Sequence, residues 1–191
     1  MICLSKKQSM KLIARGVAEL SEIKVALQSG RIFIARGNTN QYVLEELTGI
    51  KEKNFAIGYI KNGQLRTNPF QFGYVIEKGN PIKKEFEIHD KDIFIKGANA
   101  LVDGKAGVLT FGDTGTIQKN LSVKNLIIPV SLNKTVTSLE LGEYAHYKIM
   151  ELRGKVITEI TALRLLYNIQ AVHLCNGSDG SVILGIKGRS G

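Results

Sequence analysis

The chain has 191 residues, of which 43% are hydrophobic and 23% charged, and its formal net charge is +9. A chain of this size and composition can bury one full hydrophobic core, which excludes a mainly disordered or fibrous protein. No apolar run approaches the roughly 18 residues of a membrane-spanning helix, and the N-terminus has no signal-peptide core. We therefore expect a cytoplasmic protein that has no membrane partner and forms a single α/β domain over residues 1–191.

The first elements alternate between helical and strand patterns. Residues 5–27 carry apolar side chains at spacings of three and four, which predicts helix, and Ser21-Glu22 is typical of a second helix start. Residues 31–35 form an apolar run that predicts a buried strand, and residues 40–47 predict the next helix. The chain therefore begins with helices that lead into a strand and a further helix.

Residues 54–88 have a different character, with short strand-like runs and turn residues. Asn62-Gly63 is typical of a tight hairpin turn, and Pro69 and Pro81 interrupt the runs. We interpret this region as a β-rich insertion in the α/β domain.

Three later runs, residues 93–95, 108–111 and 126–130, have a continuous apolar character, as strands buried on both faces do. Helical patterns between strands favour parallel pairing through right-handed crossovers. We therefore predict an α/β fold with a mainly parallel, Rossmann-like sheet. Residues 136–191, with a helix near 158–166 and two late strands, are interpreted as a small α+β C-terminal appendage.

Two glycine-rich turns, each between a predicted strand and a predicted helix, are the main functional signal. Free backbone N–H groups and the helix dipole at such turns favour phosphate or carboxylate. An ordinary N-cap or tight turn is the alternative at both, and the second turn lacks the lysine of a nucleotide P-loop. The candidate ligand-binding residues are Gly37, Asn38, Thr39 and Asn40 in the first turn, and Gly112, Asp113, Thr114, Gly115 and Thr116 in the second.

Polar residues also follow two of the predicted strands, at the edge where ligands gather in open α/β sheets. Lys96 is placed to pair with a phosphate or to polarise a carbonyl, and Asn99 is placed to orient a hydroxyl or carbonyl. Lys134 follows the strand at 125–131 and belongs to the same edge, although a solvated loop lysine is the alternative. The histidines and cysteines have no metal-ligand spacing, so no metal site is predicted.

Three segments together are similar to parts of one superfamily. Residues 33–40 are similar to a first strand with a Gly-Ser/Thr-Thr loop, residues 92–101 to a strand that ends in Gly-Ala-Asp, and residues 126–134 to a late strand near a lysine. In this order they resemble the fold shared by ribose-5-phosphate isomerase, glucosamine-6-phosphate deaminase, CoA transferases and some sugar-phosphate sensor domains.

The resemblance covers roughly residues 10–135 and implies a phosphate loop at residues 37–40, a substrate edge at Lys96, Gly97, Asn99 and Lys134, and association into a homo-oligomer. Asn99 departs from the acid that such enzymes often carry, and the Ser-Glu-Asn-Gly run of CoA transferases is absent. The reaction of these relatives is therefore not carried over to this chain.

These observations predict a protein that binds a phosphorylated or CoA-type metabolite. An isomerase- or transferase-like reaction would use Lys96, Asn99 and Lys134 as its candidate catalytic groups. The missing acid at Asn99 favours the alternative of a non-catalytic effector-sensing module. A third interpretation is nucleic-acid binding through the net charge, but the basic residues are dispersed and no recognition motif accompanies them. No particular cofactor or substrate is indicated.

Overall fold

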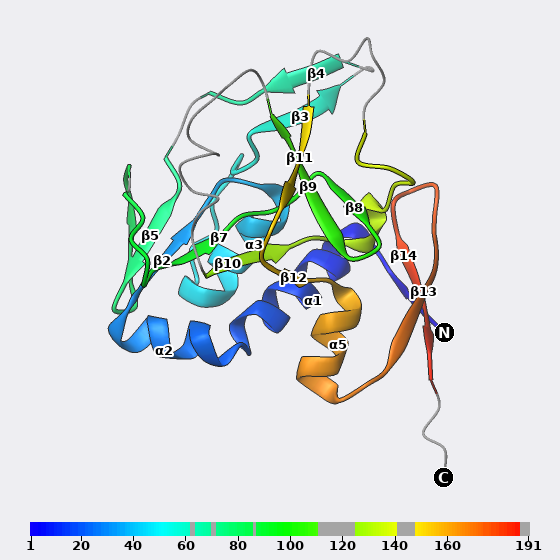
Figure 1. Cartoon of the computed structure of the whole chain (residues 1–191), viewed down its shortest axis with the longest axis horizontal. Helices are drawn as coiled ribbons and strands as arrows, with labels where there is room; N and C mark the ends of the chain where they lie inside the picture. The colour runs from blue at the N-terminus through cyan, green and yellow to red at the C-terminus, as the bar shows by residue number, and fades with distance from the viewer. Residues whose placement is uncertain (62–63, 70–71, 86, 111–124, 141–147, 188–191) are drawn as a thin grey trace.

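The structure, a computed structural model, describes residues 1–61, 64–69, 72–85, 87–110, 125–140 and 148–187. Its central layer is a mixed sheet of six strands, with bounds β2 (Arg31–Ile34), β5 (Tyr74–Glu77), β6 (Asn80–Lys83), β7 (Ile93–Ile95), β10 (Leu126–Pro129) and β12 (Lys155–Ile157). The strand order is β12–β10–β7–β2–β5–β6 (Figure 1). Strands β12, β10, β7 and β2 pair in parallel, whereas β5 and β6 join the sheet by antiparallel pairing.

Three helices cover one face of this sheet: α1 (Lys6–Ala18), α2 (Ser21–Ser29) and α3 (Asn38–Thr48). Side chains alternate along β2, so Ile32 and Ile34 pack against the helices while Phe33 belongs to the core on the opposite face. Ile32, Phe33 and Ile34 are almost completely buried, because both faces of the strand are covered.

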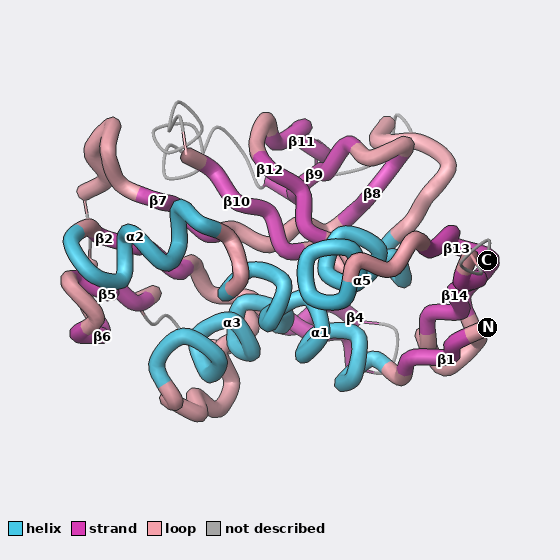
Figure 2. Tube along the Cα trace, turned by 90° about the horizontal axis from the view of Figure 1, so that it is seen from below, coloured by secondary structure: helices cyan, strands magenta, loops and turns pink. Residues whose placement is uncertain are grey.

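A smaller antiparallel sheet covers the opposite face. Its strands are β8 (Ala100–Val102), β9 (Lys105–Thr110) and β11 (Lys148–Leu152), in the order β11–β9–β8. Figure 2 shows these strands on one side of β7 and β10, with α1 and α3 on the other. The architecture in this part of the molecule is therefore three layers, with helices, the six-stranded sheet and the smaller sheet in turn.

The C-terminal part contributes to several layers. Helix α5 (Glu159–Tyr167) packs against α1, and a Cβ added at Gly16 would lie only 2.6 Å from the Ala162 Cβ. Strand β1 (Ile2–Leu4) pairs with β14 (Val182–Ile186), which pairs with β13 (Ala171–Asn176).

Two further elements lie between these parts of the chain. A short 3-10 helix, η1 (Leu132–Lys134), follows β10, and β3 (Gly58–Lys61) and β4 (Gln64–Thr67) form a separate hairpin.

Local interactions explain where several elements begin and end. Ser5 caps α1 in a reciprocal capping box with Gln8. Asp92, just before β7, accepts hydrogen bonds from the Arg31 Nε at 3.0 Å and from the His89 amide at 2.7 Å. The second of these bonds closes the turn that leads into β7, and the first ties β7 to the start of β2.

The mixed α/β class agrees with the prediction, but a mainly parallel Rossmann-like sheet is not confirmed, because the main sheet is mixed and the other sheets are antiparallel. Residues 108–111 were expected to form a central parallel strand, and for residues 108–110, which belong to β9 of the smaller sheet, this expectation is wrong. Asp103 and Gly104 adopt left-handed backbone conformations, with φ of 47° and 78°, and turn the chain back so that β9 pairs antiparallel with β8. Within the described ranges, no helix is both long enough and apolar enough to cross a membrane.

Two predicted segments are also more closely joined to the central sheet than expected. In the region 54–88, β3 and β4 form the expected hairpin, but β5 and β6 extend the six-stranded sheet. In the region 136–191, β12 is an edge strand of that same sheet.

Candidate functional site

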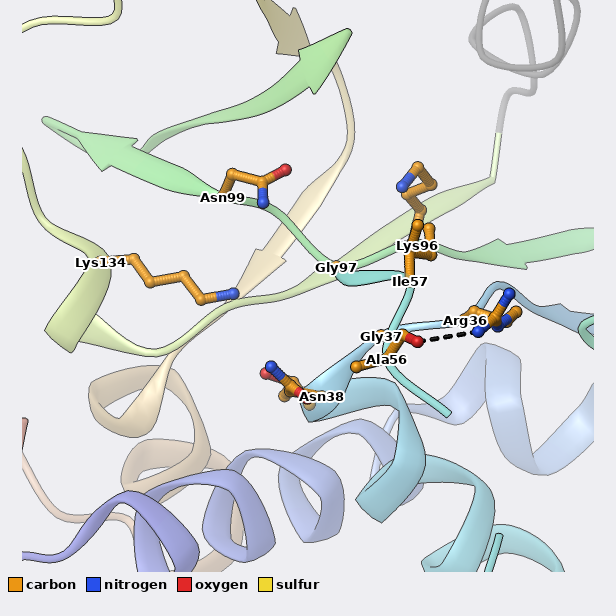
Figure 3. Close-up of a pocket in the computed structure, with 10 residues that line it drawn as sticks. Arg36, Gly37, Asn38, Ala56, Ile57, Lys96, Gly97, Asn99 and Lys134 are labelled. Carbon is orange, nitrogen blue, oxygen red and sulfur yellow. Dashed lines mark hydrogen bonds between the residues drawn. The ribbon is translucent and has the colours of Figure 1, made fainter. Parts of the chain in front are cut away.

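The carboxyl ends of β2, β7 and β10 meet at one edge of the main sheet, because these strands run in parallel. The chain leaves β2 into the start of α3, leaves β7 into residues 96–99, and leaves β10 into η1. A cavity of about 110 Å³ lies between these segments (Figure 3). It is lined by Arg36, Gly37, Asn38, Thr39, Ala56, Ile57, Lys96, Gly97, Asn99 and Lys134.

Helix α3 begins at this cavity without a side-chain cap. Its N-cap is Gly37. The alternative interpretation of the sequence, an ordinary N-cap at Asn38 or Thr39, is therefore wrong. In the described part of the chain, the amides of residues 38–40 find no hydrogen-bond acceptor. Those three N–H groups and the positive end of the helix dipole are therefore available to an anion.

Gly37 itself is not required by backbone strain. Its φ of 166° is extended backbone, and an added Cβ would come no closer than 3.7 Å to the Asn40 side chain. The protein leaves room for a side chain at this position, so any need for glycine comes from what occupies the cavity.

Two lysines line the cavity from different segments, Lys96 directly after β7 and Lys134 at the end of η1. The Lys134 Nζ donates a hydrogen bond to the Ala98 carbonyl at 2.5 Å, and Figure 3 shows its extended side chain reaching toward Gly97. Lys96 is partly exposed, and its ammonium has no hydrogen-bond or ion-pair partner among the described residues. Burial, with a further contribution from the Lys134 charge, lowers the pKa of Lys96 to about 8. Burial also lowers the pKa of Lys134, and the Glu159 carboxylate opposes that effect.

Arg36 adds a third cation to the cavity wall. One terminal nitrogen of its guanidinium donates to the Ala56 carbonyl at 2.8 Å, while the buried Nε has no partner in the part of the chain that the structure describes. Burial lowers the pKa of the Arg36 guanidinium. A buried donor without an acceptor costs free energy, so an occupant that accepts a hydrogen bond here would be stabilising.

Asn40 fixes the two loops that form the cavity floor. Its amide nitrogen donates to the Ala35 carbonyl at 2.7 Å and to the Ile95 carbonyl at 3.3 Å, and thereby joins the ends of β2 and β7. Its Oδ1 is buried and accepts no hydrogen bond from any described group. Asn40 therefore supports the site from behind and does not line the cavity.

A buried polar cluster lies beneath Lys134. Glu159 is fully buried at the start of α5, and its carboxylate accepts hydrogen bonds from the Ser9 hydroxyl, the Ser131 hydroxyl at 2.5 Å and the Leu132 amide at 2.9 Å. These bonds hold η1, which carries Lys134, against α1 and α5. Glu159 thus sets the position of Lys134 and supplies the nearest described negative charge that acts on it.

The cavity continues into two neighbouring hollows. One of about 300 Å³ shares Asn38, Thr39 and Lys134 with it and adds Lys6, and another of about 450 Å³ shares Asn38 and Ala56. Small-molecule sites typically occupy roughly 300–1,000 Å³. The combined space around the start of α3 is therefore large enough for a metabolite that extends beyond the cavity of the two lysines.

The structure brings most of the sequence-predicted residues together. Gly37, Asn38, Thr39, Lys96, Gly97, Asn99 and Lys134 all line one cavity. Residues Gly112, Asp113, Thr114, Gly115 and Thr116 lie outside the described residues. The Asn99 Oδ1 accepts a hydrogen bond from the Leu109 amide at 3.1 Å, so this side chain also has a structural role.

Sequence reasoning missed Arg36, Ala56, Ile57 and the Glu159 cluster. Arg36 stands directly before Gly37 in the glycine turn, and a basic residue at that point was an available signal. The Glu159 cluster joins residues up to 150 positions apart, and no local pattern reveals such contacts.

In the described ranges, no group of three or more metal-ligating side chains is close enough to hold a metal ion. Comparison of the chain with protein-family models, with curated proteins and with solved structures gives no significant match.

Proposed function

We propose that this protein binds a small anionic metabolite, phosphorylated or carboxylated, in the cavity between α3, residues 96–99 and η1. The observation that carries the proposal is the composition of the cavity wall. Arg36, Lys96 and Lys134 line it together with the uncapped start of α3, and none of the ten lining residues is acidic.

The electrostatics give the reason. Three like charges in a partly buried space repel one another, and removing them from water has a further cost. A bound anion offsets both effects, because it supplies the counter-charge and accepts hydrogen bonds from the lysines and from the free amides of Asn38 and Thr39, which line the cavity. Phosphate and carboxylate have the charge and the acceptor oxygens that this arrangement requires.

Thermal-shift measurements against phosphate, sugar phosphates, CoA esters, nucleotides and short carboxylates test the proposal. A ligand at a hundred times its Kd stabilises the folded state by about 2.7 kcal/mol. We expect a selective rise in Tm that Lys134→Gln reduces, since glutamine keeps an N–H donor but carries no charge. Lys105→Gln is the matched control, because Lys105 is exposed and lines none of the three hollows.

Absence of a shift with every small anion would contradict the proposal. A shift that is equal in wild type and Lys134→Gln would place the anion elsewhere. Binding that is limited to polynucleotides and falls steeply with salt would favour the nucleic-acid alternative.

A non-catalytic effector-binding module is the second candidate. The observation that favours it is that none of the described residues lining the cavity carries a carboxylate, whereas an isomerase of sugar phosphates needs a base for proton transfer. Turnover assays with the compound that gives the largest shift separate the two, because a sensor binds the compound and leaves it unchanged. The proposed relationship to the ribose-5-phosphate isomerase and CoA transferase superfamily is compatible with both.

A further inference from the structure

The two cavity lysines differ in a way that anion binding alone does not explain. Lys134 is held by the Ala98 carbonyl at 2.5 Å and lies near the Glu159 carboxylate. Lys96, in contrast, has no acceptor and no counter-ion among the described residues. A lysine that serves only to hold an anion is most effective when it is fully protonated, and this environment works against protonation of Lys96.

We propose that Lys96 is a nucleophilic amine that forms an imine with a short anionic aldehyde or ketone bound in the cavity. This inference rests on the proposed function, because the anionic group positions the carbonyl. Lys134, Arg36 and the start of α3 would hold the phosphate or carboxylate. Lys96, which lines the same cavity from the end of β7, would then face the carbonyl carbon.

The chemistry requires no cofactor. The lone pair of the neutral Lys96 Nζ forms a bond to the carbonyl carbon, and the carbonyl oxygen takes up a proton to give a carbinolamine. The carbinolamine then loses that oxygen as water, with one further proton from solvent and one lost from nitrogen, and leaves a protonated imine on Lys96. The positive imine nitrogen withdraws electrons from the neighbouring carbon and stays close to the bound anion.

The electrostatic environment supports this role. Desolvation and a neighbouring ammonium group are the two factors that activate catalytic lysines. Both act on Lys96 and lower its pKa to about 8. About one Lys96 in ten is then neutral at pH 7, compared with roughly one in three thousand for a lysine with an ordinary pKa.

Reductive trapping on the whole protein tests the inference. The probes are dihydroxyacetone phosphate and pyruvate, each added with sodium cyanoborohydride at pH 7, and labelled lysines are located by peptide mass spectrometry. Because the cavity would hold the anionic probe beside Lys96, and because a larger fraction of this amine is neutral, we expect Lys96 to be labelled at least about tenfold faster than the exposed Lys105. Dihydroxyacetone, which has the same carbon skeleton without the phosphate, should show a smaller preference, because only the larger neutral fraction of Lys96 remains. Inorganic phosphate should compete with dihydroxyacetone phosphate.

The two anionic probes distinguish the substrate class. Labelling by dihydroxyacetone phosphate alone identifies a phosphorylated carbonyl compound, and labelling by pyruvate alone identifies a 2-oxo acid. Labelling by both shows that the site accepts either anion beside a carbonyl, so each of these results supports the imine.

The variant Lys96→Arg separates this inference from the proposed function. It retains a cation, so phosphate should still raise the Tm, but the guanidinium forms no imine and position 96 should carry no label. Equal labelling of Lys96 and Lys105 in wild type, with the phosphate shift intact, would overturn the imine and leave anion binding standing. Equal labelling without any phosphate shift would overturn both.

Discussion

Replacing Lys96 by methionine should stabilise the folded protein at neutral pH, although it removes a side chain from the candidate site. Methionine is similar in length and keeps the apolar contacts of the stem. No described hydrogen bond or ion pair is lost, because the Lys96 ammonium has none. The substitution removes only an uncompensated charge, and with it the repulsion from Lys134.

The size of the effect follows from the pKa. The ordinary value of 10.5 falls to about 8 in the folded protein. One pKa unit corresponds to about 1.4 kcal/mol, which gives an upper limit of about 3.5 kcal/mol. Lys96 is partly exposed, so screening by water reduces the cost, and we expect a gain of about 2 kcal/mol, or roughly 4–8 °C in Tm for a chain of this length.

The pH dependence has a defined sign. Below pH 8 Lys96 is protonated in both the folded and unfolded states, so the full cost is present in wild type. Between pH 8 and 10.5 the unfolded chain keeps the proton that the folded chain has lost, and wild-type stability rises with pH. The advantage of Lys96→Met should therefore be constant at pH 6–7 and should disappear through this window.

Urea denaturation of both proteins from pH 6 to pH 10 measures this difference. Lys105→Met, which replaces an exposed lysine, should stay within about 0.5 kcal/mol of wild type. The reasoning is refuted if Lys96→Met is less stable than wild type at pH 7, or if its advantage is the same at pH 7 and pH 10.

Other substitutions test the supports of the site and the fold. Glu159→Ala leaves buried donors without their acceptor and should cost about 2–5 kcal/mol in urea denaturation, whereas Glu159→Gln should cost less than half as much and still weaken phosphate binding. Equal losses in the two variants would show that the hydrogen bonds to Glu159 do not matter. Gly16→Ala should cost about 1–3 kcal/mol by calorimetry, because the new Cβ would lie 2.6 Å from that of Ala162; a gain would contradict this close packing. Asp92→Ala removes the partner of Arg31 and should cost about 2–4 kcal/mol without changing phosphate affinity at the opposite end of β7, as measured by titration calorimetry.

The central strands and the site edge were predictable because their signals are local. Apolar runs at β2, β7 and β10 indicate strands buried on both faces, and parallel pairing brings their carboxyl ends to one edge. Gly37, Lys96 and Lys134 follow those ends directly, so their convergence required only the correct strand order.

The errors arose where pairing is decided by distant contacts. An apolar run is compatible with a central parallel strand or with a strand of an outer sheet, and β9 is the second kind because the turn at Asp103-Gly104 reverses the chain. Strand β1 was missed because a three-residue strand has no periodicity, and its partner β14 lies at the other end of the chain. The Glu159 cluster was missed for the same reason, because its partners lie far away in the sequence, on α1 and at the start of η1.

The stability that the three cavity cations cost and their position in the fold have a common explanation. Arg36, Lys96 and Lys134 arrive from three different strand ends, so their convergence depends on the packing of the whole central sheet. For stability alone, apolar residues at Lys96 would serve better than an ammonium without a partner. The two hydrophobic cores on either side of the sheet and the buried Glu159 hold these charges together, and none of the described residues in the cavity wall supplies a counter-charge. An arrangement of like charges that is unfavourable when empty, and that an anion would relieve, is the physical basis of our proposal that this cavity binds a ligand.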